Sequence, residues 1–332
     1  MSSTSETGSK GHAGEGGTLV AEPVLRTAEM HIYRPTEPTL GTIVRNDLCT
    51  AGKKAAGFVR HIEIDVSGTD LVGRCLPGQS IGVIPEGVDA NGKPHKVRLY
   101  SLASPSRGED GEGKVISTTV KRAIDEHWET HGLFLGVCSN YLCDRKVGEK
   151  VKLSGPNGKR FVLPARFDEH QYVFVATGTG IAPFRGMIKD LLSSGCKSTI
   201  ALVMGSPYST DLLYHDEMTK LSKEHGNFRY ITAISRESNG AHGKLYVQDR
   251  FRTDAEVLMP LLSDARTLVY ICGLAGMELG IFQEMARRLP GEALEQYLKV
   301  EPAAMADIGA WQRSMLHKDV KPTRRVFLEV YA

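Results

Sequence analysis

The sequence lacks several features that would assign the protein to a narrow class. No apolar run approaches the roughly 20 residues that a membrane-spanning helix needs. The charge is nearly balanced, with 41 basic and 39 acidic residues, so general binding to nucleic acid is not expected and any basic patch must be local. Residues 1–20 lack an apolar core and arginine, which argues against a signal or transit peptide. We therefore expect a flexible arm over residues 1–30 and a cytoplasmic protein.

The six cysteines are too scattered to predict a disulfide framework or a metal site. Cys138 and Cys143 have the spacing that opens a plant-type iron–sulfur motif, but the cysteine required three residues later is absent. Without a secretion signal, we expect all six thiols to be reduced. We predict no metal, and a one-electron carrier that works with this chain would have to be a separate protein.

The two halves of the chain differ in their pattern. Residues 40–165 contain short segments rich in β-branched residues, separated by turn clusters such as ANGKPH, which is typical of an antiparallel barrel or sandwich. From about residue 170, apolar strands alternate with helical segments, which predicts a doubly wound parallel α/β sheet. The change falls near VLPARFDEH, so we predict one domain over residues 31–165 and a second over residues 166–332.

Residues 98–104, RLYSLAS, combine a cation, an aromatic ring and a hydroxyl on one predicted strand. Because successive side chains of a strand alternate, Arg98 and Tyr100 share one face while Leu99 and Ser101 share the other. A sheet edge in water tolerates this pattern, but a sheet that holds a flat, phosphate-bearing cofactor needs it.

Two further stretches are candidates for phosphate binding. Residues 176–186, ATGTGIAPFRG, connect a predicted strand to a helix, and glycines there let the backbone approach a pyrophosphate, although the G-x-G-x-x-G pattern is absent. Residues 136–144, GVCSNYLCD, predict a short helix capped by Ser139 or Asn140. Each stretch is equally compatible with a structural turn or cap.

Polar residues also follow the third predicted strand of the second half. Arg236 would bind a phosphate as a planar fork, Lys244 would act as a point charge, and Tyr246 would stack on an adenine. Ser235 stands next to Arg236. A solvated loop explains any one of these residues equally well.

The last predicted strand, RRVFLEVYA, places Glu329 and Tyr331 on one face because its side chains repeat every two residues. Taken alone, this is a frayed chain end with an exposed ring. Cys272 ends the preceding predicted strand, where a thiol is most often a small buried group.

Taken together, these motifs have the order and approximate spacing of plant-type ferredoxin–NADP⁺ reductases, which the chain resembles over residues 40–331. The motifs are RLYSLAS, TVKR, GVCSNYLCD, GTGIAPFRG, ISRE, KLYVQ, YICG and EVY. MHIYRPTEP and GVDANGKPHKVRLYS are also similar to the reductase part of benzoyl-CoA oxygenase-type proteins. The resemblance implies an antiparallel β-barrel domain for FAD and a doubly wound α/β domain for NADP(H). It also implies electron exchange between a ferredoxin or flavodoxin and NADP(H), with hydride transfer at flavin N5.

The resemblance further implies roles for single residues. Arg98 would pair with the FAD pyrophosphate, Tyr100 would lie against one face of the isoalloxazine ring, and Ser101 would hydrogen-bond near N5. Tyr331 would stack on the other face and move aside for the nicotinamide. The implied FAD residues are Arg98, Leu99, Tyr100, Ser101, Thr119, Val120, Lys121, Val137, Cys138, Ser139 and Thr177. The implied NADP residues are Ser101, Lys121, Thr177, Ser206, Pro207, Ser235, Arg236, Lys244, Tyr246, Gly273, Leu274 and Glu329, and the implied catalytic residues are Ser101, Cys272, Glu329 and Tyr331.

Two departures from the family pattern affect this interpretation. Ala332 follows Tyr331, at which the family chain commonly ends. Asp125 occupies the position of the ring that stacks on the FAD adenine, with His127 or Trp128 as possible substitutes.

The partner and the direction of electron flow stay open at this stage. A reductase subunit that takes electrons from NADPH to an oxygenase, or a flavin-binding sensor without turnover, are the alternatives. An acidic ferredoxin would need a basic docking surface. The candidates for this surface are Lys53, Lys54, Arg60, Lys93, Lys96 and Lys159.

Overall fold

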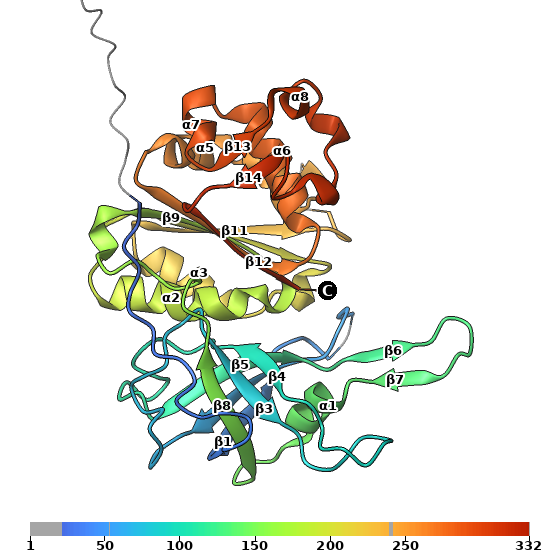
Figure 1. Ribbon diagram of the computed structural model, residues 1–332. Helices are drawn as coiled ribbons and strands as arrows, with labels where there is room; N and C mark the ends of the chain where they lie inside the picture. Colours follow the sequence, from blue (N-terminus) through green and yellow to red (C-terminus); the bar gives the residue numbers. More distant parts are fainter. Residues whose placement is uncertain (1–21, 53, 239–241, 332) are drawn as a thin grey trace, which may run out of the picture.

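The computed structural model describes residues 22–52, 54–238 and 242–331 (Figure 1). The lower part in Figure 1 is an antiparallel sheet curled into a barrel. The upper part is a parallel sheet with helices on both faces. The predicted fold class, a β-barrel followed by a doubly wound α/β unit, is confirmed.

Six antiparallel strands form the barrel, in the order β4-β3-β8-β1-β2-β5. A bridge between Leu102 and Thr118 joins the segment after β4 to β5, so the sheet closes on itself. β-branched and leucine side chains such as Ile43, Ile62 and Leu153 fill the interior and are fully buried. The strands are β1 (Thr39–Leu48), β2 (Val59–Asp65), β3 (Ser80–Ile84), β4 (Arg98–Ser101), β5 (Val115–Lys121) and β8 (Lys150–Asn157).

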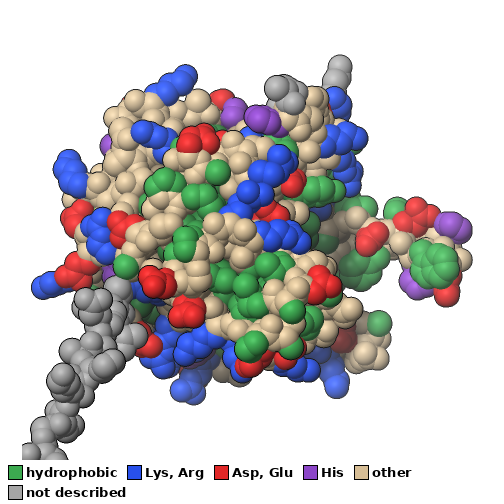
Figure 2. Space-filling view, turned by 90° about the horizontal axis from the view of Figure 1, so that it is seen from above, with side chains coloured by type: hydrophobic (Ala, Val, Ile, Leu, Met, Phe, Trp, Pro, Cys, Tyr) green, Lys and Arg blue, Asp and Glu red, His purple; other side chains and the backbone are tan. Residues whose placement is uncertain are grey.

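A two-stranded hairpin leaves the barrel after β5. It consists of β6 (Ile124–Glu126) and β7 (Leu133–Leu135), which pair with each other in an antiparallel register. The hairpin projects from the body of the protein, and hydrophobic, acidic and histidine side chains gather on it (Figures 1 and 2).

The helix predicted within residues 136–144 is present as α1 (Val137–Asp144), but its predicted cap is wrong. Gly136 occupies the N-cap position, and no side chain caps the first turn. The Ser139 hydroxyl and the Asn140 amide instead bond the backbone of Gly136 and Ala123, which ties the helix to the segment after β5.

The second sheet has five parallel strands in the order β11-β10-β9-β12-β15. Its strands are β9 (Gln171–Thr177), β10 (Ile200–Ser206), β11 (Phe228–Ile234), β12 (Thr267–Leu274) and β15 (Val326–Tyr331). α2 (Ile181–Ser193) and α3 (His215–Glu224) cover the face toward the barrel (Figure 1). The far face carries α4 (Arg250–Thr253), α5 (Ala255–Ser263), α6 (Met277–Arg288), α7 (Gly291–Glu295), α8 (Pro302–Met305) and a small sheet of β13 (Leu298–Val300) and β14 (Val320–Pro322).

The N-terminal segment contacts both halves of the protein from residue 22 onward. Leu25 forms a bridge with Pro164, and the Arg26 guanidinium lies 3.1 Å from an Asp190 carboxylate oxygen of α2. The part of the expected arm that spans residues 22–30 is therefore anchored by these contacts, whereas residues 1–21 lie outside the described residues.

The structure also describes all six cysteines, and none of them is in a disulfide. Among the helices of the described residues, none is long and apolar enough to cross a membrane.

Candidate active site

The first of three grooves lies between β4 and the beginning of α1 and has a volume of about 560 Å³. We call it the β4–α1 groove. β4 contributes the Arg98 guanidinium and the half-buried Tyr100 ring, whose phenol pKa is raised by burial. Since no side chain caps the first turn of α1, its N–H groups suit an anion. The predicted residues that line the groove are Arg98, Leu99, Tyr100, Val137, Cys138 and Ser139.

The second groove lies at the carboxyl ends of the parallel strands and has a volume of about 410 Å³. We call it the sheet-end groove. Its opposite wall comes from the barrel and includes Gly57 and Val59. Open α/β sheets bind ligands at this end of their strands. The predicted residues that line the groove are Lys121, Thr177, Ser206, Pro207, Ser235, Tyr246, Leu274 and Tyr331.

Close backbone packing explains the glycines and the threonine at this sheet end. A Cβ on Gly180 would lie 2.1 Å from the Cys272 carbonyl oxygen, so only glycine fits there. Gly273 adopts φ +150°, and a Cβ on it would collide with the Thr177 hydroxyl. That hydroxyl accepts a hydrogen bond from the Leu274 N–H at 3.0 Å. The ends of β9 and β12 are thereby fixed side by side.

Tyr331 lies at the end of β15 and lines the sheet-end groove. Its backbone carbonyl accepts a hydrogen bond from the Ala275 N–H at 2.8 Å, and its hydroxyl is 2.6 Å from Thr179 Oγ1. The side chain is 39% exposed, and burial raises the pKa of its phenol to about 12. Sequence reasoning did not single out Thr179.

The third groove, which we call the edge groove, lies beside the outer edge of β15 and has a volume of about 840 Å³. Glu329 lines it, and burial raises the pKa of this carboxyl to about 7. Three basic side chains, Lys159, Arg160 and Arg324, line the same groove. Glu329 and Tyr331, which were expected on one face of the strand, therefore line different grooves.

Several predicted residues line none of the three grooves. Val120 is fully buried in the barrel core, and the Thr119 hydroxyl lies 2.5 Å from the Tyr214 hydroxyl. The Ser101 carbonyl accepts a hydrogen bond from Thr118, and its side chain is half-buried. The side chains of Thr119 and Val120 consequently do not line the grooves as expected.

Cys272 is buried, and this burial raises its thiol pKa, as does the Glu329 carboxylate. Arg236 and Lys244 are exposed. The Arg236 N–H donates to the Pro207 carbonyl at 2.9 Å, which places Arg236 at the rim of the sheet-end groove. Its guanidinium lies 5.8 Å from the centre of the Tyr208 ring, a residue that sequence reasoning missed.

Known proteins resemble this chain over most of its length. A family model described as an oxidoreductase NAD-binding domain matches residues 174–282. A ferredoxin–NADP reductase of Spirulina sp. is 43% identical, and the match covers 77% of this chain and 88% of that protein. The chain belongs to the ferredoxin–NADP reductase family. It is therefore an oxidoreductase.

Two further relatives support the family assignment. The root-type chloroplastic ferredoxin–NADP reductase of Nicotiana tabacum is 41% identical over 81% of this chain and 74% of its own length. The solved ferredoxin–NADP⁺ reductase from Plasmodium falciparum has a TM-score of 0.68 at 21% identity, covering 92% of this chain and all of that one. This second likeness shows the shared fold.

Ferredoxin–NADP reductases use FAD and NADP(H). The residues of the β4–α1 groove and of the sheet-end groove fit these groups. The β4–α1 groove joins a half-buried ring to cations and to an uncapped helix turn, a donor set that suits an isoalloxazine linked to a pyrophosphate. His95 and Lys96 also line this groove, although the sequence predicted neither as an FAD residue and predicted Lys96 as part of the docking surface. Both lie in GKPHKVRLYS, directly before Arg98.

The hairpin carries Asp125 together with His127 and Trp128, the two substitutes expected for the ring that stacks on the FAD adenine. Asp125 and Trp128 lie on the exposed hairpin, and Trp128 is 81% exposed. Phe134 of β7 lines the β4–α1 groove. Asp125, His127 and Trp128 do not line it. Sequence reasoning missed Phe134 because it considered only the residues soon after TVKR.

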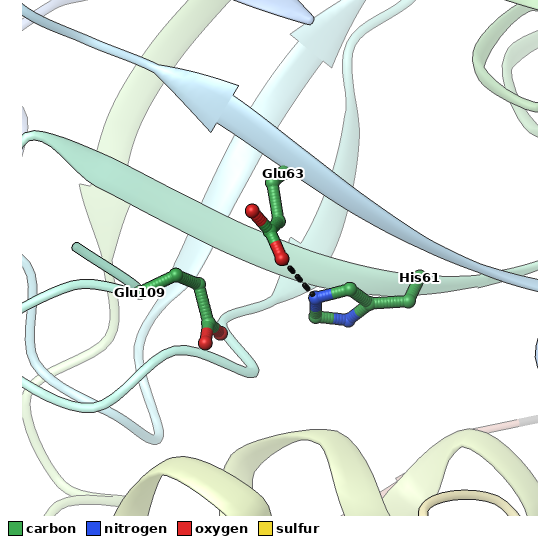
Figure 3. A group of neighbouring side chains, drawn as sticks. All are labelled: His61, Glu63 and Glu109. Carbon is green, nitrogen blue, oxygen red and sulfur yellow. Dashed lines mark hydrogen bonds and ion pairs between the residues drawn. The ribbon is translucent and has the colours of Figure 1, made fainter. Parts of the chain in front are cut away.

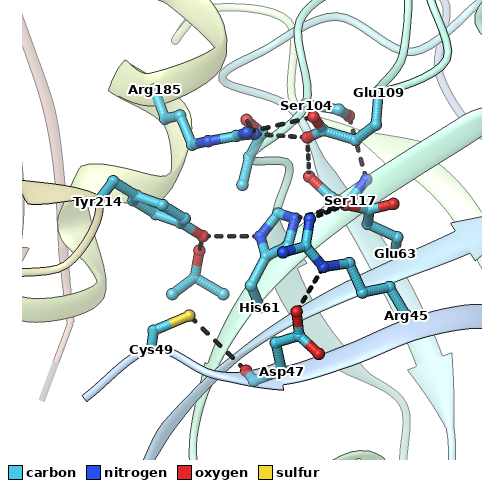
Figure 4. Close-up of polar contacts among 12 residues, drawn as sticks. Arg45, Asp47, Cys49, His61, Glu63, Ser104, Glu109, Ser117, Arg185 and Tyr214 are labelled. Atoms are coloured by element: carbon cyan, nitrogen blue, oxygen red, sulfur yellow. Dashed lines mark hydrogen bonds and ion pairs between the residues drawn. The ribbon is translucent and has the colours of Figure 1, made fainter. Parts of the chain in front are cut away.

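A polar network joins the two sheets of this reductase (Figure 4). Arg185 of α2 bonds Glu109 at 2.5 Å and the Ala103 carbonyl at 3.1 Å, both from the barrel half. Burial alone would raise the pKa of Glu109, but Arg185 lowers it to about 2. Tyr214, which precedes α3, bonds His61 Nδ1 at 2.9 Å. These buried contacts fix the parallel sheet over the barrel and thereby set the geometry of the grooves.

The same network contains the one group of potential metal ligands found among the described residues: His61, Glu63 and Glu109 (Figure 3). Their ligand atoms lie within 4.8 Å of one another. Each is already engaged, since Glu109 pairs with Arg185, and Glu63 bonds both His61 at 3.2 Å and Arg45 at 3.1 Å. We interpret the group as part of the contact between the sheets.

Proposed function

We propose that the β4–α1 groove of this FAD-dependent ferredoxin–NADP(+) reductase holds FAD and that its sheet-end groove holds NADP(H). The supporting observation is that neighbouring residues of the barrel half line the two grooves: Lys121 lines the sheet-end groove, and Ala123, two residues later, lines the β4–α1 groove. Each contains an aromatic ring, Tyr100 in the first and Tyr331 in the second. When bound, FAD supplies the N5 atom through which a hydride is exchanged with the nicotinamide.

The residues of the chain bind the two groups and orient their rings. We assign Arg98 and the first turn of α1 to the FAD pyrophosphate, and Phe134 to the adenine end of the β4–α1 groove. Tyr100 and Tyr331 would face the isoalloxazine from opposite sides. Ser101 and Glu329, whose pKa of about 7 lets it hold or release a proton near neutral pH, would form a proton route to N5.

We assign residues at the far end of the sheet-end groove to the adenosine 2′-phosphate. Ser235 and Tyr246 line the groove, and Arg236 lies at its rim, while Lys244 is exposed nearby in sequence. The remaining roles implied by the family resemblance stay predictions. The domain boundary at residues 165/166 and a cytoplasmic location, which six reduced thiols favour, belong to the same proposal.

We propose a ferredoxin as the partner, and the edge groove as its docking surface. Lys159, Arg160 and Arg324 line the groove together with the carboxylates of Glu22 and Glu329, so its cations outnumber its anions. Of the six cations proposed from the sequence, Lys159 lines this groove. Lys54 pairs with Glu237, and Arg60 bonds the Asn46 carbonyl. Lys93 and Lys96 lie between β3 and β4, and Lys53 lies outside the described residues.

Ferredoxin-linked turnover should therefore fall steeply as salt rises, because screening weakens the attraction between a basic groove and an acidic carrier. Lys159→Glu should raise the KM for ferredoxin and flatten the salt profile. Lys220→Glu on α3, which does not line the edge groove, is the matched control. A flat salt profile in the unmodified enzyme would contradict the docking proposal, and preference for a flavodoxin or an oxygenase component would change the partner.

The function is tested by a visible spectrum of the purified protein, followed by anaerobic titration with NADPH and then NADH. We expect a yellow protein that NADPH bleaches at a far lower concentration than NADH does. A colourless protein that takes up no FAD would contradict the proposed role of the β4–α1 groove.

A further inference from the structure

Tyr331 is held by hydrogen bonds at its backbone and at its side-chain hydroxyl. On the backbone side, β15 pairs with β12 in parallel, with Tyr331 opposite Leu274, and the Tyr331 carbonyl accepts the Ala275 N–H. On the far side, the hydroxyl bonds Thr179 at 2.6 Å. Thr179 lies in the turn between β9 and α2, so the side chain bridges from one strand end to the turn of another.

The turn that carries Thr179 is held in place by its neighbours. Gly178 has a φ of +53°, a left-handed conformation that favours glycine. Gly180 packs so closely on the Cys272 carbonyl that no Cβ fits. Because both flanking residues are fixed, the Thr179 hydroxyl is presented to Tyr331 at a set position. Thr179 and Tyr331 both line the sheet-end groove.

We propose that Thr179 is a positioning residue whose hydroxyl stabilises Tyr331 in its seated position and so sets the affinity of the enzyme for the nicotinamide half of NADP(H). The inference rests on the proposed function and on the role that the family resemblance implies for Tyr331, whose ring must leave before the nicotinamide can enter. When the Tyr331 ring leaves, the hydrogen bond between the two hydroxyls breaks, and each hydroxyl forms a hydrogen bond with water instead. A hydrogen bond of this kind stabilises the seated ring by a modest net amount.

Thr179→Val keeps the shape of the side chain and removes the hydroxyl. We expect it to lower the Kd for NADP⁺ by about two- to tenfold, the range that one net hydrogen bond gives. Thr179→Ser, which keeps the hydroxyl, should match the unmodified enzyme. Adenosine 2′,5′-bisphosphate, which has no nicotinamide, should bind all three proteins equally. Calorimetric titration of the FAD-loaded proteins measures both ligands without turnover.

A double-mutant cycle distinguishes this role from direct contact with the dinucleotide. In a Tyr331→Phe background the bond is already absent, so Thr179→Val should have no further effect on the Kd for NADP⁺. An effect that persists in that background, an equal change for both ligands, or no change in Thr179→Val alone would overturn the proposal. If the unmodified protein bound neither ligand, the proposed function itself would fail, which is a separate outcome.

Discussion

Replacing Tyr331 with serine is expected to tighten the binding of NADP⁺ by about 5- to 30-fold. Burial of an aromatic side chain stabilises it by roughly 1.5–3 kcal/mol, and the ring is only partly buried, so we take about 1–2 kcal/mol as the free energy of its displacement. Serine removes the ring, so the nicotinamide no longer competes with it. Perturbation of the flavin absorbance by NADP⁺ gives the Kd.

Tyr331→Phe is the matched control, because it retains the ring and loses only the hydroxyl that bonds Thr179. Its Kd for NADP⁺ should fall by about two- to tenfold, the effect of losing that hydrogen bond alone, and by less than in Tyr331→Ser. NAD⁺ should gain affinity in the serine variant as well, since the displaced ring faces the nicotinamide that both dinucleotides share. Unchanged Kd values in Tyr331→Ser would remove Tyr331 from the mechanism.

Arg236→Ala should raise the KM for NADPH by about 10- to 100-fold, the range expected when a charged hydrogen bond to a phosphate is lost. The KM for NADH, which lacks the 2′-phosphate, should change little. Steady-state assays with an artificial acceptor measure both values and do not depend on the natural partner.

Arg229→Ala is the control for this substitution. Arg229 lies near the opposite end of β11, where its guanidinium bonds the Gly226 and Phe228 carbonyls. The Arg229→Ala substitution should leave the preference for NADPH over NADH unchanged. An equal rise in KM for NADPH and NADH in Arg236→Ala would mean that the 2′-phosphate binds elsewhere.

The elements of the fold were predictable because their determinants are local. Runs of β-branched residues between turn clusters marked β2 (Val59–Asp65) and β5 (Val115–Lys121), and an apolar run followed by glycines marked β9 and the turn after it. The cap of α1 was not predictable in the same way. Ser139 is a good capping residue by type, but the segment after β5 offers its hydroxyl other partners.

Contacts between distant parts of the chain were the ones that sequence reasoning missed. Arg185 was part of a recognised motif, yet its partner Glu109 lies 76 residues away in a turn-rich loop. Thr179 and Tyr331 are separated by 152 residues. Phe134 lines the β4–α1 groove because the β6–β7 hairpin places it there, and no local sequence pattern specifies the direction of that hairpin. The residue types suited these roles, but only the fold brings the partners together.

The arrangement around Tyr214 has a consequence for the width of the sheet-end groove. Its hydroxyl lies 2.9 Å from His61 Nδ1 of β2 and 2.5 Å from Thr119 Oγ1 of β5, so one side chain of the α/β half contacts two strands of the barrel. Any movement of one half against the other would break several buried hydrogen bonds at once, which is costly. The sheet-end groove has walls from both halves. We therefore expect it to keep its width while NADP(H) enters and leaves.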